Sequence, residues 1–448
     1  MDRKYLYIQT FGCQMNVNDS EKIVALLAQD GYEATDDAGR ADLIVVNTCS
    51  IREKAAQKAY SQLGRFRLLK ERNPDLILAM GGCLAQERGK TAMGRIPFLD
   101  IVFGTHQIHR LPGLIRQVAA SHAPMVETGF ESPVKSLEIA AAPPNGSVSA
   151  YVTVMQGCNN YCSYCVVPLL RGPEVSRAMS AITAEVERLA GSGIREVTLL
   201  GQNVNSYGLS GSGGAQFPHL LRTIGRIRGI ERIRFTTSHP KDLSDDLIRC
   251  FADVEALCEH IHLPVQSGSN DILKRMNRGY SREHYLERVE RLRTVCPEIS
   301  VTSDVIVGFP GESDRDFEAT LDLMRKVRFD NLFSFKYSER EGTAAVALDR
   351  RIPERVKQER LQCLQKLQEQ HTLERNSAFE GRTEAVLVEG VSRNSERDMS
   401  GRTRSNRIVN FRGGDDLVGK TIPVRIMKAY LHSLRGDVQK ERNRCSSK

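Results

Sequence analysis

The sequence predicts an α/β protein in three parts: an N-terminal parallel sheet of the flavodoxin-like type, a partial (β/α)6 barrel and a small OB-like β-barrel at the C-terminal end. A chain of 448 residues is too long for one hydrophobic core. Apolar runs alternate with helical segments over most of the chain, which favours parallel sheets, whereas the last part has short strand-like runs between glycine-rich turns. We therefore expect domains over residues 1–130, 151–375 and 376–440, a linker over 131–150 and a basic tail over 441–448.

The N-terminal domain is predicted from three apolar runs that each lead to a cysteine. Helical segments separate these runs, and we expect one helix to start at Asp19, where an acidic residue and the following serine can cap a first turn. Because the carboxyl ends of parallel strands meet at one edge of a sheet, the three cysteines are predicted to converge there. The runs are residues 5–8 before Cys13, 43–46 before Cys49 and 76–79 before Cys83.

Six further strand-like runs, separated by helical segments, predict the barrel. Chemistry in such a barrel takes place at the carboxyl ends of the strands. The linker before the barrel is rich in Ala, Pro and Ser. After the last strand, Pro353 is expected to start a charged helix that runs to about Phe379. The predicted strands cover residues 151–156, 196–200, 232–237, 260–266, 301–307 and 331–337.

The C-terminal domain is predicted from three short β-rich runs at residues 384–388, 407–411 and 421–426. From Arg382 onward the chain has 15 Lys and Arg against 8 Asp and Glu, so this part carries nearly all of the net charge of +8. A solvated basic surface would explain the surplus. Binding to the phosphates of a nucleic acid is the other explanation, less favoured on charge alone, and charge does not decide between the two.

The composition, with 40% hydrophobic and 26% charged residues, is that of a soluble globular protein. The start has no apolar signal core and no apolar run is long enough to span a membrane, so we expect a cytoplasmic protein without a membrane partner. In the reducing cytosol, eleven cysteines indicate metal ligands or catalytic groups rather than disulfides. Five of them share no pattern. We expect Cys250, Cys258, Cys296 and Cys363 to pack in the core or between helices, and Cys445 to be an exposed thiol.

The densest chemical signal is the C-x3-C-x2-C motif of Cys158, Cys162 and Cys165, which follows the first predicted barrel strand. Three thiolates on one loop can each bind one iron of a [4Fe–4S] cluster. The fourth iron then lacks a protein ligand, and S-adenosylmethionine (SAM) can occupy it through its amino and carboxylate groups. The alternatives are a zinc site or buried free thiols. A structural zinc prefers four N or S ligands, and no histidine or fourth cysteine is close in the sequence.

The N-terminal trio of Cys13, Cys49 and Cys83 is a weaker signal, because scattered cysteines are usually small buried hydrophobic residues. Each of the three, however, follows a predicted strand and stands next to a glycine or a threonine. This repeated position favours metal ligands over buried hydrophobic residues. Three ligands again predict a [4Fe–4S] cluster with one open iron. This second cluster could hold an additional sulfur atom that becomes part of the product.

The motif at residues 157–165 (GCNNYCSYC) resembles the signature of the radical SAM superfamily. The resemblance implies that its three cysteines bind the superfamily's cluster, within a partial (β/α)6 barrel. Residues 201–203 (GQN) stand where the superfamily contacts the SAM amino group, and residues 305–308 (VIVG) resemble its adenine-contacting motif. The resemblance therefore suggests five SAM-binding residues: Gly201, Gln202, Asn203, Ile306 and Gly308.

Three N-terminal motifs resemble those of the MiaB-type tRNA methylthiotransferases, a family of that superfamily. They are residues 10–16 (TFGCQMN), 47–55 (NTCSIREKA) and 81–83 (GGC). Residues 401–411 (GRTRSNRIVNF) resemble the family's TRAM domain, a small RNA-binding β-barrel. One departure follows the cysteine loop, where the family commonly has a tyrosine and a polar or small residue, and this chain has Leu169 and Leu170.

The resemblance implies an enzyme that uses two [4Fe–4S] clusters and SAM to convert N6-isopentenyladenosine, next to the anticodon of tRNA, to its 2-methylthio derivative. One SAM would methylate a sulfur held at the N-terminal cluster, and a second would yield the radical that removes hydrogen from carbon 2 of the adenine. Residues 14–16 and 50–53 resemble this branch better than those acting on threonylcarbamoyl-adenosine or on an aspartate of a ribosomal protein. The alternative of another class is an iron–sulfur electron-transfer or scaffold protein, which leaves the barrel unexplained.

The implied partners are the tRNA anticodon loop and an external electron donor, and the sequence carries no signal for oligomeric state. Leaving the stack is inexpensive for a base in a single-stranded loop. We expect Arg402, Arg404 and Arg407 of the TRAM-like segment to contact the RNA. Arg171 and Arg177, which follow the cysteine loop, could contact phosphate or the SAM carboxylate, or form ion pairs.

Overall fold

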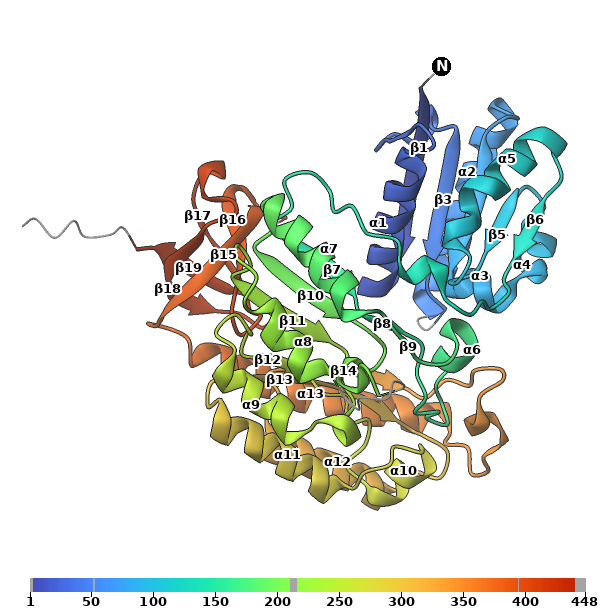
Figure 1. Ribbon diagram of the computed structural model, residues 1–448. Helices are drawn as coiled ribbons and strands as arrows, with labels where there is room; N and C mark the ends of the chain where they lie inside the picture. Colours follow the sequence, from blue (N-terminus) through green and yellow to red (C-terminus); the bar gives the residue numbers. More distant parts are fainter. Residues whose placement is uncertain (1–2, 51–52, 210–215, 394, 440–448) are drawn as a thin grey trace, which may run out of the picture.

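The structure is a computed structural model that describes residues 3–50, 53–209, 216–393 and 395–439. The β/α barrel lies between the N-terminal sheet and the small C-terminal barrel (Figure 1). This arrangement confirms the predicted α/β fold class. Among the described residues, no helix has both the length and the apolar character needed to cross a membrane. The predicted basic tail over 441–448, with Cys445, lies outside the described residues.

The N-terminal domain is a parallel sheet with the strand order β2-β1-β3-β4-β5-β6. Helices pack on both of its faces, which is why the central strands β3 and β4 are buried throughout and read as continuous apolar runs. The order β2-β1-β3 is that of flavodoxin-like sheets, which bind ligands at the carboxyl ends of their strands. The elements are β1 (Lys4–Phe11), α1 (Gln14–Ala28), β2 (Tyr32–Ala34), β3 (Leu43–Thr48), α2 (Glu53–Arg72), β4 (Ile77–Gly82), α3 (Cys83–Arg88), α4 (Lys90–Arg95), β5 (Ile101–Phe103), α5 (Leu111–Ser121) and β6 (Met125–Glu127).

Helix α1 begins at Gln14, before the predicted start at Asp19. Cys13 is its N-cap residue and makes no side-chain capping bond. Asp19 lies inside the helix, where it is buried and paired with Arg171 of the barrel. The prediction was wrong because the polar residues of the first turns do not face solvent. Asn18, for example, donates a hydrogen bond of 3.0 Å to the carbonyl oxygen of Tyr151.

The middle domain contains two three-stranded parallel sheets, in the orders β7-β10-β11 and β12-β13-β14. A bridge between Ile233 of β11 and Leu257, just before β12, joins them, so the six strands form one open barrel in chain order. All six predicted strands are present, although β12 is shorter than expected. The elements are β7 (Ser149–Thr153), β8 (Met155–Gln156), α6 (Val167–Arg171), β9 (Val175–Ser176), α7 (Met179–Gly191), β10 (Glu196–Leu200), α8 (Phe217–Ile224), β11 (Arg232–Thr236), α9 (Asp245–Asp253), β12 (His260–His262), α10 (Asn270–Arg275), α11 (Arg282–Val295), β13 (Ser300–Val307), α12 (Asp314–Val327), β14 (Asn331–Lys336) and α13 (Glu354–Ser377).

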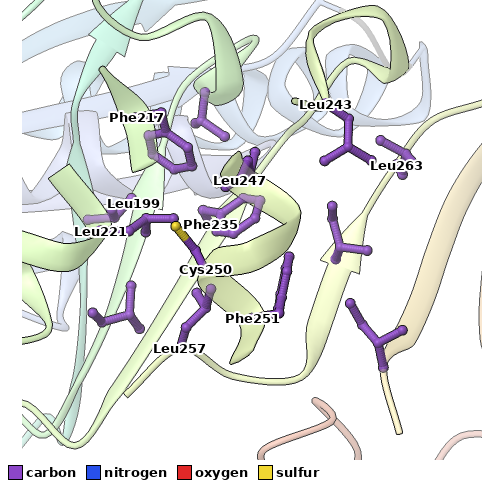
Figure 2. Close-up of a cluster of buried hydrophobic side chains, with 14 of the residues drawn as sticks. Leu199, Phe217, Leu221, Phe235, Leu243, Leu247, Cys250, Phe251, Leu257 and Leu263 are labelled. Atoms are coloured by element: carbon purple, nitrogen blue, oxygen red, sulfur yellow. The ribbon is translucent and has the colours of Figure 1, made fainter. Parts of the chain in front are cut away.

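The cysteines without a motif pack mainly in the barrel. Cys250, Cys258 and Cys296 are buried, as predicted. Figure 2 shows Cys250 of α9 among leucine and phenylalanine side chains, and its thiol lies 3.8 Å from the carbonyl oxygen of Pro218. Cys363 is exposed on α13, so the prediction that it packs was wrong. The outer face of a surface helix tolerates a small thiol without burying it.

The segment over 131–150 packs against both neighbours. Val134 and Leu137 are buried, and the carbonyl oxygen of Ser136 accepts a hydrogen bond of 3.2 Å from Lys22 Nζ of α1. A composition rich in Ala, Pro and Ser therefore marks an irregular connection here, but one that is held to the N-terminal domain.

The C-terminal domain is a closed five-stranded barrel with the order β15-β16-β17-β19-β18. Closure leaves no free sheet edge. Two of its strands, β16 and β19, were not predicted, because their sequences hold few apolar residues. The strands are β15 (Thr383–Ser392), β16 (Ser395–Thr403), β17 (Ile408–Arg412), β18 (Thr421–Ala429) and β19 (Leu434–Val438).

The C-terminal barrel covers the end of the central barrel at which the strands begin. Its side chains bond to residues that stand just before or at the start of β11, β12 and β14. The pairs are Thr421 with Glu231, Arg404 with Glu259 and Arg407 with Asp330. The cysteine loop follows β8, at the other end of the barrel, so the two features lie on opposite sides of this domain (Figure 1).

Candidate active site between the N-terminal sheet and the barrel

The structure brings Cys13, Cys49 and Cys83 to one edge of the N-terminal sheet. They follow the neighbouring strands β1, β3 and β4, whose register aligns Phe11 with Thr48 and Thr48 in turn with Gly82. Neighbouring strands are about 4.8 Å apart, so cysteines that follow aligned residues lie close together. None of the three is in a disulfide.

Two glycines and two buried asparagines make this close approach possible. At Gly12 (φ +153°), an added Cβ would lie 2.8 Å from the Cβ of Cys49. At Gly82 (φ +88°), it would lie 2.3 Å from Asn47 Oδ1. Asn16 Nδ2 donates to Asn47 Oδ1 at 3.2 Å, and Asn47 Nδ2 donates to the carbonyl oxygen of Asn16 at 2.8 Å. These hydrogen bonds fix α1 to the end of β3. Both asparagines belong to the sequence motifs, but the motifs did not indicate this role.

The second trio, Cys158, Cys162 and Cys165, lies on the loop between β8 and α6. The loop is anchored at its start, where the backbone N–H of Gly157 donates to Gln202 Oε1 at 2.6 Å. Gly157 has φ +82°, and an added Cβ would lie 2.0 Å from a backbone oxygen, so only glycine fits. The three thiols are free and partly buried.

Arg278 donates a hydrogen bond to the barrel trio, a role that the sequence did not predict. Its Nη1 donates to Cys162 Sγ at 3.3 Å, and its Nη2 donates to the carbonyl oxygen of Pro264 at 2.7 Å. The side chain is buried and also bonds to the hydroxyl of Tyr280 at 3.1 Å. No sequence signal marks Arg278, which lies more than a hundred positions after the cysteines that it meets.

Burial strongly disfavours thiolates at these sites in the absence of metal. It raises the pKa of Cys83 to about 12 and that of Cys165 to about 12. Metal binding replaces the protons of such thiols, and nearby cations then stabilise the ligand charge. Arg171 lowers the pKa of Cys83, and Arg278 lowers that of Cys165, although burial dominates in both cases.

Helix α6 links the two cysteine sites (Figure 1). It follows Cys165 directly, and Val166 and Leu170 pack against Cys83 of the N-terminal domain. Thr105 Oγ1 donates to the carbonyl oxygen of Leu170 at 2.7 Å, which fixes α6 to the sheet. Leu170 thus has an apolar partner, whereas its neighbour Leu169 is 46% exposed. The departure from the family pattern therefore affects one contact between the domains.

Two arginines after the loop form buried ion pairs. Arg171 pairs with Asp19, and Arg177 pairs with Glu185, each at 2.7 Å and with all four side chains at most 5% exposed. Of the alternatives considered for these arginines, the structure shows the ion pair. The Arg171–Asp19 pair joins the barrel to α1, whereas the Arg177–Glu185 pair lies within the barrel domain.

The predicted SAM residues Gly201, Gln202 and Asn203 follow β10 and lie beside the cysteine loop. Gln202 bonds to Gly157, as described above. Asn203 is 2% exposed; its Nδ2 donates to Asp242 Oδ2 at 2.8 Å, while its Oδ1 is buried without a partner among the described residues. Gly201 permits close packing, since an added Cβ would lie 2.4 Å from Met155 Cγ.

The other two predicted SAM residues, Ile306 and Gly308, have different surroundings. Ile306 packs in the small cluster that includes Tyr164 of the cysteine loop. Gly308 (φ +71°) instead faces α13, where an added Cβ would lie 2.3 Å from Lys357 Cγ. Its N–H donates to Glu312 Oε2 at 2.7 Å. The observed contacts of Gly308 are therefore structural, and its contact with SAM stays a prediction.

Unsatisfied polar atoms gather at the carboxyl ends of the barrel strands. A buried polar atom without a partner is costly, so such a group indicates a polar ligand. SAM offers amino, carboxylate, hydroxyl and adenine groups that fit these donors and acceptors. The atoms without a partner among the described residues are Gln156 Nε2, Asn203 Oδ1, Thr237 Oγ1, Ser238 Oγ and His239 Nε2.

His239 belongs to this group as a neutral donor. Burial lowers its pKa to about 2, with further contributions from Arg278 and Lys241. The backbone N–H of Lys241 donates to His239 Nδ1 at 3.2 Å, so the proton of the neutral ring resides on Nε2. Its ring packs edge-on against Tyr280, with 5.6 Å between centroids. The sequence offered no ligand spacing that would have identified His239.

A cavity of about 410 Å³ opens beside the N-terminal trio. Ser50 and Leu84, the neighbours of Cys49 and Cys83, lie in its wall, and the segment after β14 closes it from the barrel side. Arg95 contributes to the wall and stacks over the ring of Tyr60, at 4.0 Å from the centroid. A second cavity of about 420 Å³ shares Tyr60 and Arg95 and continues along α2.

The three arginines predicted to bind RNA lie where the two barrels meet. The side chain of Arg407 is 10% exposed and bonds to Asp330 and Asn376, and that of Arg404 forks onto Glu259 at 2.8–2.9 Å. The guanidinium groups of these two arginines bond to the central barrel, and their contact with RNA stays a prediction. Arg402 pairs with a glutamate of β15 and is 33% exposed, so its contact with RNA stays a prediction.

The donor set fits iron–sulfur clusters better than single metal ions. Among the residues that the structure describes, no group of three His, Cys, Asp or Glu side chains is close enough to bind one metal ion. In a [4Fe–4S] cluster each cysteine binds a different iron, so its sulfurs are spaced more widely than the ligands of one ion. Each trio consists of cysteines alone, and thiolate is the ligand that such clusters require.

Three family models match successive parts of the chain. They are an uncharacterized protein family, UPF0004, over residues 5–104, the radical SAM superfamily over 152–324 and the TRAM domain over 377–439. A tRNA-2-methylthio-N(6)-dimethylallyladenosine synthase of Syntrophus aciditrophicus (strain SB) is 59% identical over 98% of this chain and 95% of its own length. The protein of the same name from Geobacter sulfurreducens is 51% identical over 98% of both chains.

Solved structures share the fold at low identity. A radical S-adenosylmethionine methyltransferase, TsrM from Kitasatospora setae, has a TM-score of 0.57 and 15% identity, and the match covers 74% of this chain and 73% of that one. The cobalamin-dependent S-adenosylmethionine radical enzyme OxsB has a TM-score of 0.54 and 12% identity, over 83% of this chain and 56% of its own. At these identities the likeness concerns the fold alone.

An open six-stranded β/α barrel with a C-x3-C-x2-C loop at the carboxyl ends of its strands defines a radical SAM enzyme, whose cofactors are [4Fe–4S] clusters and SAM. The N-terminal sheet and the TRAM barrel narrow this class. The chain belongs to the family of the tRNA-2-methylthio-N(6)-dimethylallyladenosine synthases, which are tRNA methylthiotransferases.

Proposed function

We propose that this enzyme adds a methylthio group to carbon 2 of N6-isopentenyladenosine next to the anticodon of tRNA. The observation that carries the proposal is the pair of cysteine trios, one at the edge of the N-terminal sheet and one on the barrel loop, linked by α6. Relatives named for the dimethylallyladenosine reaction at 59% and 51% identity support this branch over threonylcarbamoyl-adenosine or a protein aspartate. An electron-transfer scaffold would leave the polar atoms in the barrel without a ligand.

In this proposal each trio holds one [4Fe–4S] cluster: Cys158, Cys162 and Cys165 in the barrel, and the N-terminal trio at the sheet. A cluster with SAM on its open iron supplies a radical that can remove hydrogen from an unactivated C–H bond. Arg278 stabilises the barrel site by donating to Cys162. The enclosed position between two domains excludes water and oxidants from the reaction. The reducing electron comes from an external donor.

The SAM molecule would lie over the polar atoms at the carboxyl ends of the strands. Asn203 Oδ1 is an acceptor suited to the SAM amino group, and His239 Nε2–H is a donor suited to its carboxylate or ribose. Neither atom has another partner among the described side chains. Gln202 acts indirectly, by holding Gly157 at the start of the cysteine loop.

The RNA would enter through the cavity next to the N-terminal trio. Arg95 and Tyr60 there combine a positive charge with an aromatic face, which suits a phosphate and an unstacked base. On the C-terminal barrel, Arg425 and Lys428 of β18 and Tyr430, which follows this strand, are exposed and offer a similar combination. A tRNA that contacts both would span the central barrel, and such an enzyme works in the cytoplasm.

The test is iron and acid-labile sulfide content after anaerobic reconstitution, together with nucleoside analysis of isopentenylated tRNA. About eight irons are expected in the wild type and about four in each triple variant, Cys13→Ala/Cys49→Ala/Cys83→Ala and Cys158→Ala/Cys162→Ala/Cys165→Ala. The N-terminal variant should still cleave SAM but form no methylthio product. Full iron content in that variant would refute the second cluster, and methylthiolation of threonylcarbamoyl-adenosine in tRNA alone would refute the proposed substrate.

A further inference from the structure

One buried arginine of the barrel stands at the N-terminal cysteine site. Arg171 is the last residue of α6, and its side chain is 4% exposed. Its Nη2 donates to Asp19 Oδ2 at 2.7 Å, whereas its Nη1 is buried with no hydrogen-bond partner among the described residues. A guanidinium donor is costly to bury without an acceptor. The unpaired Nη1 therefore indicates an acceptor that the protein itself does not supply.

The surroundings of Arg171 identify where that acceptor lies. Leu170, the preceding residue, packs directly against Cys83. The backbone is fixed as well, because the ring Nε2 of His106 bonds to the carbonyl oxygen of Arg171 at 3.0 Å. Arg171 is thus held between Asp19 of α1, to which it bonds, and Leu170, which contacts Cys83.

The barrel contributes a positive charge to this site. Three thiolates on a [4Fe–4S] core leave one negative charge in excess. Arg171, on α6 of the barrel, carries the opposite charge, and its partner Asp19 lies on α1 of the N-terminal domain.

We propose that Arg171 donates a hydrogen bond from Nη1 to a sulfur of the N-terminal cluster and raises the reduction potential of that cluster, with Asp19 as the group that orients it. A donor and a positive charge stabilise the more negative, reduced state of a cluster. Arg171 is a positioning residue, and through it the barrel completes the site of the N-terminal domain. The inference rests on the proposed function, since it requires a cluster at this trio.

The experiment uses full-length Cys158→Ala/Cys162→Ala/Cys165→Ala protein, reconstituted anaerobically so that only the N-terminal site can hold iron. The midpoint potential is measured by redox titration followed by electron paramagnetic resonance. Arg171→Met should lower the potential, with about a tenfold change in the reduction equilibrium, or about 59 mV for one electron. Asp19→Asn should raise it, because a negative charge is removed. Arg171→Lys, which keeps the charge, should fall between Arg171→Met and the parent.

Arg171→Met and Asp19→Asn break the same ion pair, so loss of domain docking would affect both variants alike. Shifts of the midpoint potential in opposite directions therefore distinguish the proposed role from docking. Arg177→Met is the matched control: it breaks the other buried pair, with Glu185, and should leave the potential unchanged. If Arg171→Met does not fold with iron, Asp19→Asn decides alone, since a raised potential supports the proposal and an unchanged one overturns it. Equal potentials in all iron-loaded variants overturn it as well. Absence of iron in the parent variant refutes the N-terminal cluster itself.

Discussion

Buried charges are unusually dense where α1 meets the barrel. Asp19, Lys22, Arg171, Arg177 and Glu185 are each at most 5% exposed. Pairing and hydrogen bonding offset the cost of burying them, but removal of one partner leaves an uncompensated charge. Burial lowers the pKa of Lys22 to about 8 in spite of the nearby Asp19, and its ammonium donates to the carbonyl oxygens of Ser136 and Leu137. At this scale, function depends on the charge balance and not on any one pair.

Glu21, the residue before Lys22, leads to a prediction about pH. Burial raises its pKa from 4.5 to about 7, with a smaller contribution from Glu185. The folded protein therefore binds this proton more tightly than the unfolded chain, and the stability contributed by the protonated carboxyl is lost as pH rises from about 4.5 through 7. Glu21→Gln should be about 2 kcal/mol more stable than the wild type at pH 8, after allowance for partial exposure, and nearly equal at pH 5.

The measurement is the difference in thermal midpoint between the variant and the wild type across this pH range. Comparison with the wild type cancels the titration of other groups. A difference that does not change between pH 5 and pH 8 would contradict the assignment of this titration to Glu21.

At the scale of elements, α6 is short but connects the two cysteine sites. It continues the barrel loop on one side and contacts Cys83 through Leu170 on the other. The sheet fixes it through Thr105, which bonds to its last turn. A displacement of α6 would therefore change the surroundings of both trios, and the distance between the two clusters depends on the position of this helix.

Leu170→Ala should loosen this link. Loss of a buried leucine typically costs about 2–5 kcal/mol, and here the cavity would open next to Cys83. We expect a lower iron content of the N-terminal site and a lower thermal midpoint, with the barrel site still loaded. Leu169→Ala is the matched control, because Leu169 is 46% exposed, and it should leave both quantities unchanged. Equal effects of the two substitutions would refute the role of α6.

The strand β18 carries the second prediction at this scale. Lys428 lies 5.5 Å from the ring centroid of Tyr430, and Tyr430 is 48% exposed. Lys428→Ala/Tyr430→Ala should weaken tRNA binding about tenfold and reduce its dependence on salt by about one phosphate contact. Fluorescence anisotropy with an anticodon stem–loop measures both. Lys420→Ala, which removes an equally exposed lysine near Asp416, is the control. Unchanged affinity of the double variant for the stem–loop would contradict an RNA site at Lys428 and Tyr430.

At the scale of the whole molecule, the three domains depend on one another. The N-terminal domain meets the end of the barrel at which the strands finish, and the C-terminal barrel covers the end at which they begin. Arg232, 2% exposed at the start of β11, donates to the carbonyl oxygens of Arg402 and Ala385 at 2.6 and 2.9 Å. Arginines at this end of the central barrel thus connect it to the C-terminal barrel.

Arg232→Met should detach the C-terminal barrel without affecting the cysteine sites. Two buried carbonyl groups would lose their donor, which costs about 1–3 kcal/mol each. We expect a lower thermal midpoint and weaker tRNA binding, while iron content and SAM cleavage without tRNA remain those of the wild type. Loss of iron in this variant would show that the two ends of the central barrel are coupled.

The sequence by itself predicted the α/β class, the six strands of the central barrel, three strands of the N-terminal sheet and the two cysteine trios, whereas β2, β5 and β6 were not predicted. These features depend on local patterns: apolar runs, turn residues and close spacing of ligands. Strands β16 and β19 escaped prediction because a small closed barrel buries few apolar side chains per strand. Only the tertiary structure decided the partners of charged residues. Arg171 with Asp19, Arg278 with Cys162 and Arg407 with Asp330 join positions far apart in the chain. The physical reason is that the pattern of charged residues in a sequence does not indicate which distant residue each buried charge will contact in the folded protein.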